Sequence, residues 1–71
     1  MEREIAISGG MIRLGQLLKL AGMSAAGADA KALIASGQVS VNGEPELRRG
    51  RQLHPGDVVG VGAEALRVVA G

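Results

Sequence analysis

The sequence predicts an α+β fold in which two short helices pack against a small, mostly antiparallel sheet of about four or five short strands. Three observations lead to it. Apolar residues recur at helical spacing in two segments, 12–21 and 29–36. Short alternating or β-branched apolar runs lie before and after them, and Gly, Pro or Asn residues separate the segments. With 71 residues, the chain is expected to form one domain over residues 1–71.

The first strand and the first helix follow from two different periodicities. Residues 4–7 alternate polar and apolar side chains and are followed by Ser-Gly-Gly at 8–10, which predicts a strand and then a loop with Ser8 as a possible helix cap. Between Ile12 and Ala21 the apolar residues follow the i, i+3, i+4, i+7 rule, which predicts an amphipathic helix. Gly22 is expected to end it in a left-handed conformation.

A second helix is expected after a flexible connection at 23–27. Asp29 is predicted to lie in its first turn, where a carboxylate favours the positive end of the helix dipole. The apolar spacing continues through Leu33 and Ile34 until Gly37 ends the helix, and Lys31 should point away from the core.

A hairpin is predicted next. Val-Ser-Val at 39–41 alternates as a half-buried strand, and Asn42-Gly43 is a strong signal for a two-residue hairpin turn because both residues tolerate positive φ. The following segment, 47–53, is expected to form the second arm, with Gly50 as a bulge or bend. Which arginines of this arm share a face is left open.

Two further strands complete the expected sheet. Pro-Gly-Asp at 55–57 predicts a turn in which Asp57 bonds nearby amides. The runs 58–61 and 66–69 are rich in β-branched residues and have the length of strands. The last of them could pair with the first strand of the chain.

Composition narrows the function classes. Cysteine is absent and His54 is the only histidine, so disulfides, thiolate chemistry and a cysteine-ligated zinc site are excluded, and no metal site, cofactor or catalytic site is expected. No apolar stretch is long enough to cross a membrane, and residues 1–4 do not resemble a secretory signal, so a cytoplasmic protein is expected. The net charge is only +1, so the distribution of the charges has to indicate a partner.

Several motifs, taken in order, resemble the S4-type RNA-binding domain. The resemblance spans residues 12–61 and is carried by Arg-Leu at 13–14 and the segments 30–37, 39–43 and 55–59. In particular it resembles the small stand-alone bacterial YbcJ-like group, which shares Arg-Leu-Gly-Gln, here 13–16, and Arg-Arg-Gly-Arg, here 48–51. One departure is that the larger family carries Ser-Arg where this chain has Ala26-Gly27. The resemblance implies a protein without enzymatic activity that binds structured RNA.

Basic residues are the candidate contacts. Three arginines fall within four positions, and guanidinium groups match phosphate oxygens, so mutual repulsion among them would be relieved by a polyanion. Other candidates are basic residues on the exposed faces of the two helices. The full set predicted to contact RNA is Arg13, Lys19, Lys31, Arg48, Arg49 and Arg51.

The partner is expected to be a structured RNA, either ribosomal RNA or tRNA, and the ribosome itself is a possible target. The chain contains no Phe, Tyr or Trp, so we expect it to recognise the shape and the phosphates of the RNA and not to stack on its bases. Two alternatives stay open. One is a protein adaptor that docks an acidic partner with the same face. The other is a β-grasp sulfur carrier, which the Gly-Asp-x-Val pattern at 56–59 and the final Gly71 would suit.

Overall fold

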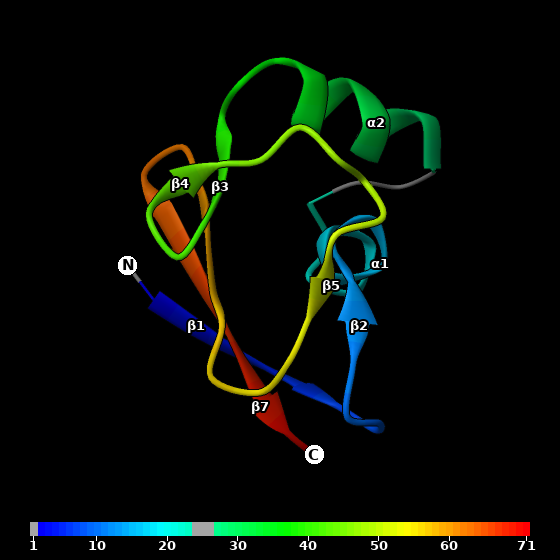
Figure 1. The fold of residues 1–71 in the computed structure, drawn as a ribbon, viewed down its shortest axis with the longest axis vertical. Helices are drawn as coiled ribbons and strands as arrows, with labels where there is room; N and C mark the ends of the chain where they lie inside the picture. Colours follow the sequence, from blue (N-terminus) through cyan, green and yellow to red (C-terminus); the bar gives the residue numbers. More distant parts are fainter. Residues whose placement is uncertain (1, 24–26) are drawn as a thin grey trace.

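The computed structural model describes residues 2–23 and 27–71, which form two helices and seven strands (Figure 1). In chain order these are β1 (Glu2–Ile7), β2 (Ile12–Arg13), α1 (Leu14–Leu20), α2 (Gly27–Ala35), β3 (Val39–Val41), β4 (Glu44–Pro45), β5 (Gln52–Leu53), β6 (Val58–Val61) and β7 (Glu64–Ala70).

Five of the strands form one sheet in the order β1-β7-β6-β3-β4. The pairs β7–β6, β6–β3 and β3–β4 are antiparallel, whereas β1 pairs with β7 in parallel, from Glu2 opposite Ala65 to Ile7 opposite Ala70. Two helices with a mostly antiparallel sheet confirm the predicted fold class. The expected pairing between the first and last strands is also confirmed, and it joins the two ends of the chain.

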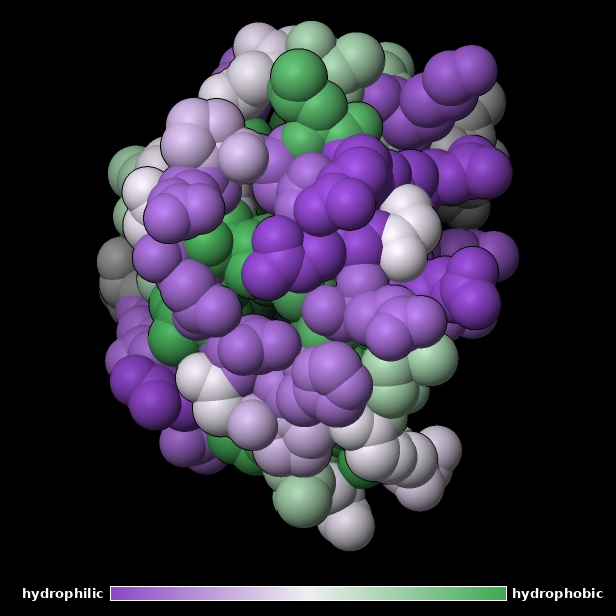
Figure 2. Space-filling model, viewed as in Figure 1, coloured by the Kyte–Doolittle hydropathy of each residue, from purple (hydrophilic) through white to green (hydrophobic). Residues whose placement is uncertain are grey.

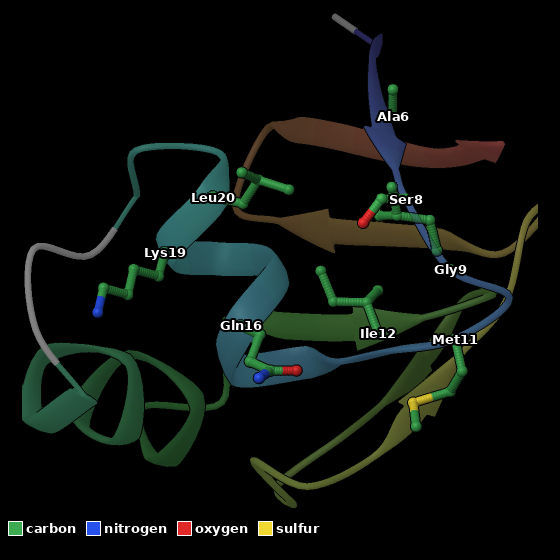
Figure 3. A pocket seen from close by; sticks show the side chains of 9 residues that line it. Ala6, Ser8, Gly9, Met11, Ile12, Gln16, Lys19 and Leu20 are labelled. Carbon is green, nitrogen blue, oxygen red and sulfur yellow. The ribbon is translucent and has the colours of Figure 1, made fainter. Parts of the chain in front are cut away.

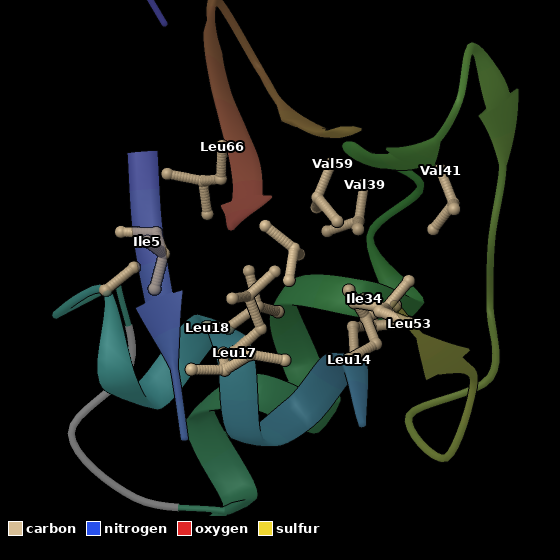
Figure 4. Packing of buried hydrophobic residues seen from close by; sticks show 13 residues of the cluster. Ile5, Leu14, Leu17, Leu18, Ile34, Val39, Val41, Leu53, Val59 and Leu66 are labelled. Carbon is tan, nitrogen blue, oxygen red and sulfur yellow. The ribbon is translucent and has the colours of Figure 1, made fainter. Parts of the chain in front are cut away.

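The core lies between the helices and one face of the sheet (Figure 4). Strands β1, β3, β6 and β7 direct alternate residues towards it, as the two-residue repeat of a strand requires, whereas both residues of β4 are exposed. The helical contributions come at the predicted spacing, from α1 and from Ile34 of α2. The largest completely buried side chains are Leu14, Leu17, Leu18, Ile34, Leu53, Leu66, Val39, Val59 and Val68.

Helix α1 begins two residues later than predicted. Ile12 and Arg13 are extended and pair with Leu53 and Gln52 in a separate two-stranded sheet. Arg13 has φ −87° and ψ 150°, and the side-chain oxygen of Gln16 accepts a hydrogen bond from its backbone N–H at 3.3 Å. The expectation that Ile12 belongs to the helix and that Ser8 caps it is therefore wrong, because pairing with a distant strand holds this segment extended.

The turns follow their residue signals. Asn42 and Gly43 have φ of 52° and 87°, and these positive values at both central residues are those of the predicted two-residue hairpin turn. Gly22 and Gly37 follow the helices with φ of 76° and 84°, as predicted. Residues 24–26, which include the Ala26 departure from the family pattern, lie outside the described residues. In the part of the chain that is described, no helix is long and apolar enough to cross a membrane.

Truncation of a core residue tests this packing. Leu66 is completely buried in β7, so Leu66→Ala should lower the free energy of unfolding by about 2–5 kcal/mol, through lost burial and the cavity left behind. Urea unfolding followed by circular dichroism measures this. The matched control Leu47→Ala removes a side chain that is 66% exposed and should change stability by no more than about 0.5 kcal/mol. Equal losses in both variants would contradict the placement of the core.

Candidate functional site

The clustered arginines lie in a loop rather than in a strand. The hairpin formed by β3 and β4 ends at Pro45, and the chain forms its next strand only at Gln52. Residues 46–51 between them are called the arginine loop here. The prediction of a second hairpin arm over 47–53 is therefore wrong, and only its last two residues form a strand, which pairs with β2 instead of β3.

Glu46 holds the arginine loop in shape. Its side chain is only 8% exposed, and its carboxylate accepts hydrogen bonds from Arg51 Nη1 at 2.8 Å and from Arg48 Nε at 3.1 Å. The backbone N–H groups of Leu47 and Arg48 also donate to it, each at 3.1 Å. One buried carboxylate thus satisfies donors from both ends of the loop. The expected repulsion among the arginines is offset within the protein, because Glu46 cancels one of their three charges.

The contacts change the titration of both partners. Hydrogen bonds from the side chains of Arg48 and Arg51 lower the pKa of Glu46 from its ordinary value of 4.5 to about 2. The same contact raises the pKa of Arg48. Glu46 is therefore ionised at every physiological pH, and the loop keeps the net charge that two of its three arginines provide.

The arginine loop also caps the start of α1. The first N–H groups of a helix have no partner inside the helix and need an acceptor elsewhere. Here Leu14 N donates to the Arg51 carbonyl at 2.9 Å and Gly15 N to the Arg49 carbonyl at 3.0 Å. The loop is thus fixed to the helix through its backbone, while the side chains of Leu47, Arg48 and Arg49 stay exposed.

Gly15 allows Arg49 to lie across α1. A Cβ atom at position 15 would be 3.1 Å from Cδ of Arg49 and 2.5 Å from its Cγ, and the second distance is closer than nonbonded carbons approach. The Arg49 side chain therefore occupies the space that any other residue at position 15 would fill. The absence of a side chain at Gly15 thus allows the Arg49 side chain to take this direction.

Three of the predicted contact residues converge on one surface depression, called the cationic groove here. It has a volume of about 330 Å³ and runs between α1, the arginine loop and Ala30 of α2. Lys19 lines it from α1, Arg13 from the position just before this helix, and Arg49 from the arginine loop. Residues far apart in the sequence thus place three positive charges around one depression. Figure 2 shows strongly hydrophilic residues gathered over the region where Figure 1 places these elements.

The other predicted residues lie apart from this groove. Arg48 and Arg51 line a second shallow depression together with Gln52 and His54. Lys31 is exposed on α2, as predicted, but it is not among the residues that line the cationic groove. The question of which clustered arginines share a face is thereby answered: Arg48 and Arg51 lie together, and Arg49 lies with the helix.

His54 and Asp57 have the structural roles expected from their sequence context. Asp57 accepts a hydrogen bond from His54 N at 2.8 Å and another from Asn42 Nδ2 at 3.2 Å, which joins two turns. These contacts, led by the His54 amide, lower the pKa of Asp57. Among the described residues, no group of three or more His, Cys, Asp or Glu side chains is arranged to bind a metal ion.

Glu46 is the residue that sequence reasoning missed. An acidic residue two positions before an arginine cluster is a usable signal, because a short loop can bring the opposite charges together. The burial of its side chain was not predictable, since burial depends on how distant segments of the chain pack around it.

Comparison with known proteins identifies relatives over most of the chain. Residues 5–69 match the family model described as S4 domain. A Bacillus subtilis (strain 168) protein named "Probable ribosome maturation protein RlbA" is 49% identical over 59 residues, which cover 83% of each chain. A second relative, named "Putative RNA-binding protein YbcJ" from Escherichia coli (strain K12), is 42% identical over 59 residues, covering 83% of this chain and 84% of that protein.

A solved structure shares the fold. The solution structure of YbcJ from E. coli, described as revealing an αL motif involved in RNA binding, superposes with a TM-score of 0.66 and 36% sequence identity. The match covers 97% of this chain and 86% of that one. These comparisons agree with the resemblance found in the sequence.

Replacing the buried carboxylate tests its role. Because folding lowers the pKa of Glu46 to about 2, the stability from its contacts is complete above its ordinary value of 4.5 and is lost as the pH falls towards 2. Glu46→Gln should therefore unfold at lower urea concentration than the wild type at about pH 6, and the difference should shrink on acidification. Asp57 titrates both in the wild type and in Glu46→Gln, so the difference in stability between the two proteins reports the titration of Glu46 alone. Stability curves that run parallel from about pH 6 to pH 2 would contradict this role.

Proposed function

The chain belongs to the S4 domain family, and on that premise we propose that it is a non-catalytic protein that binds structured RNA through the cationic groove. The observation that carries the proposal is the convergence of Arg13, Lys19 and Arg49 around one depression. Guanidinium and ammonium groups arranged around a concave surface suit the phosphate oxygens of a folded RNA backbone. The relatives named for RNA binding support the class of ligand.

Arg48 and Arg51 extend the binding surface on the far side of the loop. Both give donors to Glu46, but Arg48 remains 75% exposed and Arg51 37% exposed. A guanidinium group carries five N–H donors, so each can contact a phosphate while it stays bonded to Glu46. Glu46 acts here as an internal anion that orients the arginines before RNA arrives, which reduces the entropy lost on binding.

Ribosomal RNA is the target that we favour, with tRNA as the alternative. The relative named for ribosome maturation supports an RNA of the ribosome. A cytoplasmic location follows from the same proposal. The β-grasp carrier is not supported, because two helices lie between the first strand and the hairpin and the family match is to the S4 domain.

The salt dependence of binding tests the groove. If about five basic side chains contact phosphates, the logarithm of affinity should fall against the logarithm of salt concentration with a slope of roughly −4. The triple variant Arg13→Ala/Lys19→Ala/Arg49→Ala should bind more weakly, with a slope of about −2. The measurement is fluorescence anisotropy with ribosomal fragments, tRNA and an unstructured RNA, at about 50 to 200 mM salt.

Arg67→Ala is the control for charge alone, because Arg67 is paired with Glu2 on the sheet and lies outside both depressions. It should leave the slope unchanged. The groove residues are preferred to Arg48 and Arg51 as test positions, since removing those two would leave the buried Glu46 carboxylate without its partners. A flat salt response in the wild type would exclude RNA binding by phosphate contacts and favour an adaptor that docks an acidic protein.

Gly15→Ala tests the groove without changing any charge. The added methyl group must displace the Arg49 side chain, so affinity for RNA should fall about as much as in Arg49→Ala, with the slope reduced by about 0.7 to 0.9. Ala favours helix over Gly by up to about 1 kcal/mol, so loss of binding should come without loss of fold. The double variant Gly15→Ala/Arg49→Ala should bind like Arg49→Ala alone. Additive losses would show that Gly15 acts through something other than Arg49.

A further inference from the structure

A second groove lies on the other flank of α1, called the apolar groove here (Figure 3). It has a volume of about 780 Å³ and is bounded by Ala6 near the end of β1, by Met11 and Ile12, and by Leu20 of α1. Its size falls within the range of small-molecule sites, which runs from roughly 300 to 1,000 Å³. This groove is larger than the cationic groove and differs from it in chemistry.

Exposed apolar side chains are concentrated here. Among the described residues, only three large hydrophobic residues are exposed: Met11 at 40%, Leu20 at 58% and Leu47 at 66%. Met11 and Leu20 both line the apolar groove. Keeping such side chains in water is unfavourable, and their gathering on one concave surface is typical of a binding site.

The apolar groove and the cationic groove share a wall. Gln16 and Lys19 of α1 line both of them. In Figure 3, the Lys19 side chain points away from Ile12 and Met11, so its charge is directed out of the apolar part. A ligand that places a phosphate in the cationic groove therefore finds an apolar surface of the protein on the other side of α1.

From this juxtaposition we propose that the apolar groove holds an unpaired nucleobase of the same RNA whose phosphates lie in the cationic groove. The inference rests on the proposed RNA binding and adds its specificity: the RNA must present an unstacked base, as in a bulge or a loop. Unpaired bases are the usual targets of sequence-specific RNA recognition, because their faces and edges are accessible.

The lining suits a nucleobase. A base has flat apolar faces and a polar edge, so it needs an apolar slot with hydrogen-bonding groups at the rim. Met11 offers a polarisable thioether, which makes favourable contacts with aromatic rings, and Leu20 and Ile12 offer aliphatic surface. Gln16 uses its side-chain oxygen to bond the Arg13 amide, which leaves its Nε2 hydrogens to donate to a base edge. The chain has no Phe, Tyr or Trp, so these side chains take the place of an aromatic platform.

A nucleobase fits this surface better than an apolar peptide segment because of the shared wall. An apolar peptide segment has no anion to place beside Lys19, whereas a nucleotide supplies a phosphate on one side of α1 and a ring on the other. The apolar groove thus adjoins the proposed phosphate site across α1.

The experiment compares two hairpin RNAs that differ only in one bulged nucleotide. The wild type should bind the bulged hairpin about two- to tenfold more tightly than the fully paired one. The variant Met11→Ala/Leu20→Ala should lose this preference while it keeps its affinity for the paired hairpin and its salt slope. Val58→Ala, which truncates an apolar residue on β6 next to buried Val59 and so on the opposite face of the sheet, is the matched control and should keep the preference.

Methyl NMR spectra give an independent readout. The protein has no Phe, Tyr or Trp, and its one other aromatic ring, the imidazole of His54, does not line this groove. A ring-current shift of the Met11 or Leu20 methyl signals on titration therefore reports an aromatic ring of the RNA. Upfield shifts with the bulged hairpin, and not with the paired one, are expected.

The outcomes separate the two proposals. Salt-sensitive binding of both hairpins with equal affinity and unshifted methyl signals would overturn the nucleobase site and leave the proposed function standing. Equal weakening of both hairpins by Met11→Ala/Leu20→Ala would overturn it as well, because the groove would then not distinguish a free base. No salt-sensitive binding of either hairpin would refute the proposed function, and the nucleobase site with it.

Discussion

The bonds from the arginines to the buried carboxylate of Glu46 are the constraint on which the candidate site depends. They turn the chain back after β4, so that the carbonyls of Arg49 and Arg51 reach the first amides of α1. The same turn aligns β5 with β2 and lays Arg49 over Gly15. A carboxylate that stays ionised because its pKa is about 2 is well suited to this position, since a neutral acid would lose most of the attraction that closes the loop.

Much of the fold could be predicted because its signals are local. The spacing of Leu14, Leu17 and Leu18 specifies one face of α1 whatever lies elsewhere in the chain, and Asn42-Gly43 specifies a hairpin turn through the backbone freedom of two residues. The parallel pairing of β1 with β7 was expected only as a possibility, because strand propensity identifies the strands but does not determine their partners.

The parts that could not be predicted depend on contacts between distant segments. Ile12 continues a helical pattern, yet it is extended because Leu53, forty-one positions later in the sequence, pairs with it. The arginine cluster has no periodicity, so nothing in it separated Arg49 from Arg48 and Arg51; the carboxylate of Glu46 and the missing side chain of Gly15 do so. Residue type thus identified the cations, and tertiary contacts determined which of them meet.

Helix α1 explains why two grooves of different chemistry lie side by side. Successive residues of a helix are turned by about 100° around its axis. Measured from Gln16, Leu20 therefore lies about 40° to one side, whereas Lys19 lies about 60° and Gly15 about 100° to the other side. The order around the exposed face is therefore Gly15, Lys19, Gln16 and Leu20, which matches the lining of the cationic groove at one end and of the apolar groove at the other. With its remaining face buried through Leu14, Leu17 and Leu18, a helix of seven residues can form a wall of both grooves. A small chain without aromatic residues can in this way place charge and apolar surface within reach of a single nucleotide.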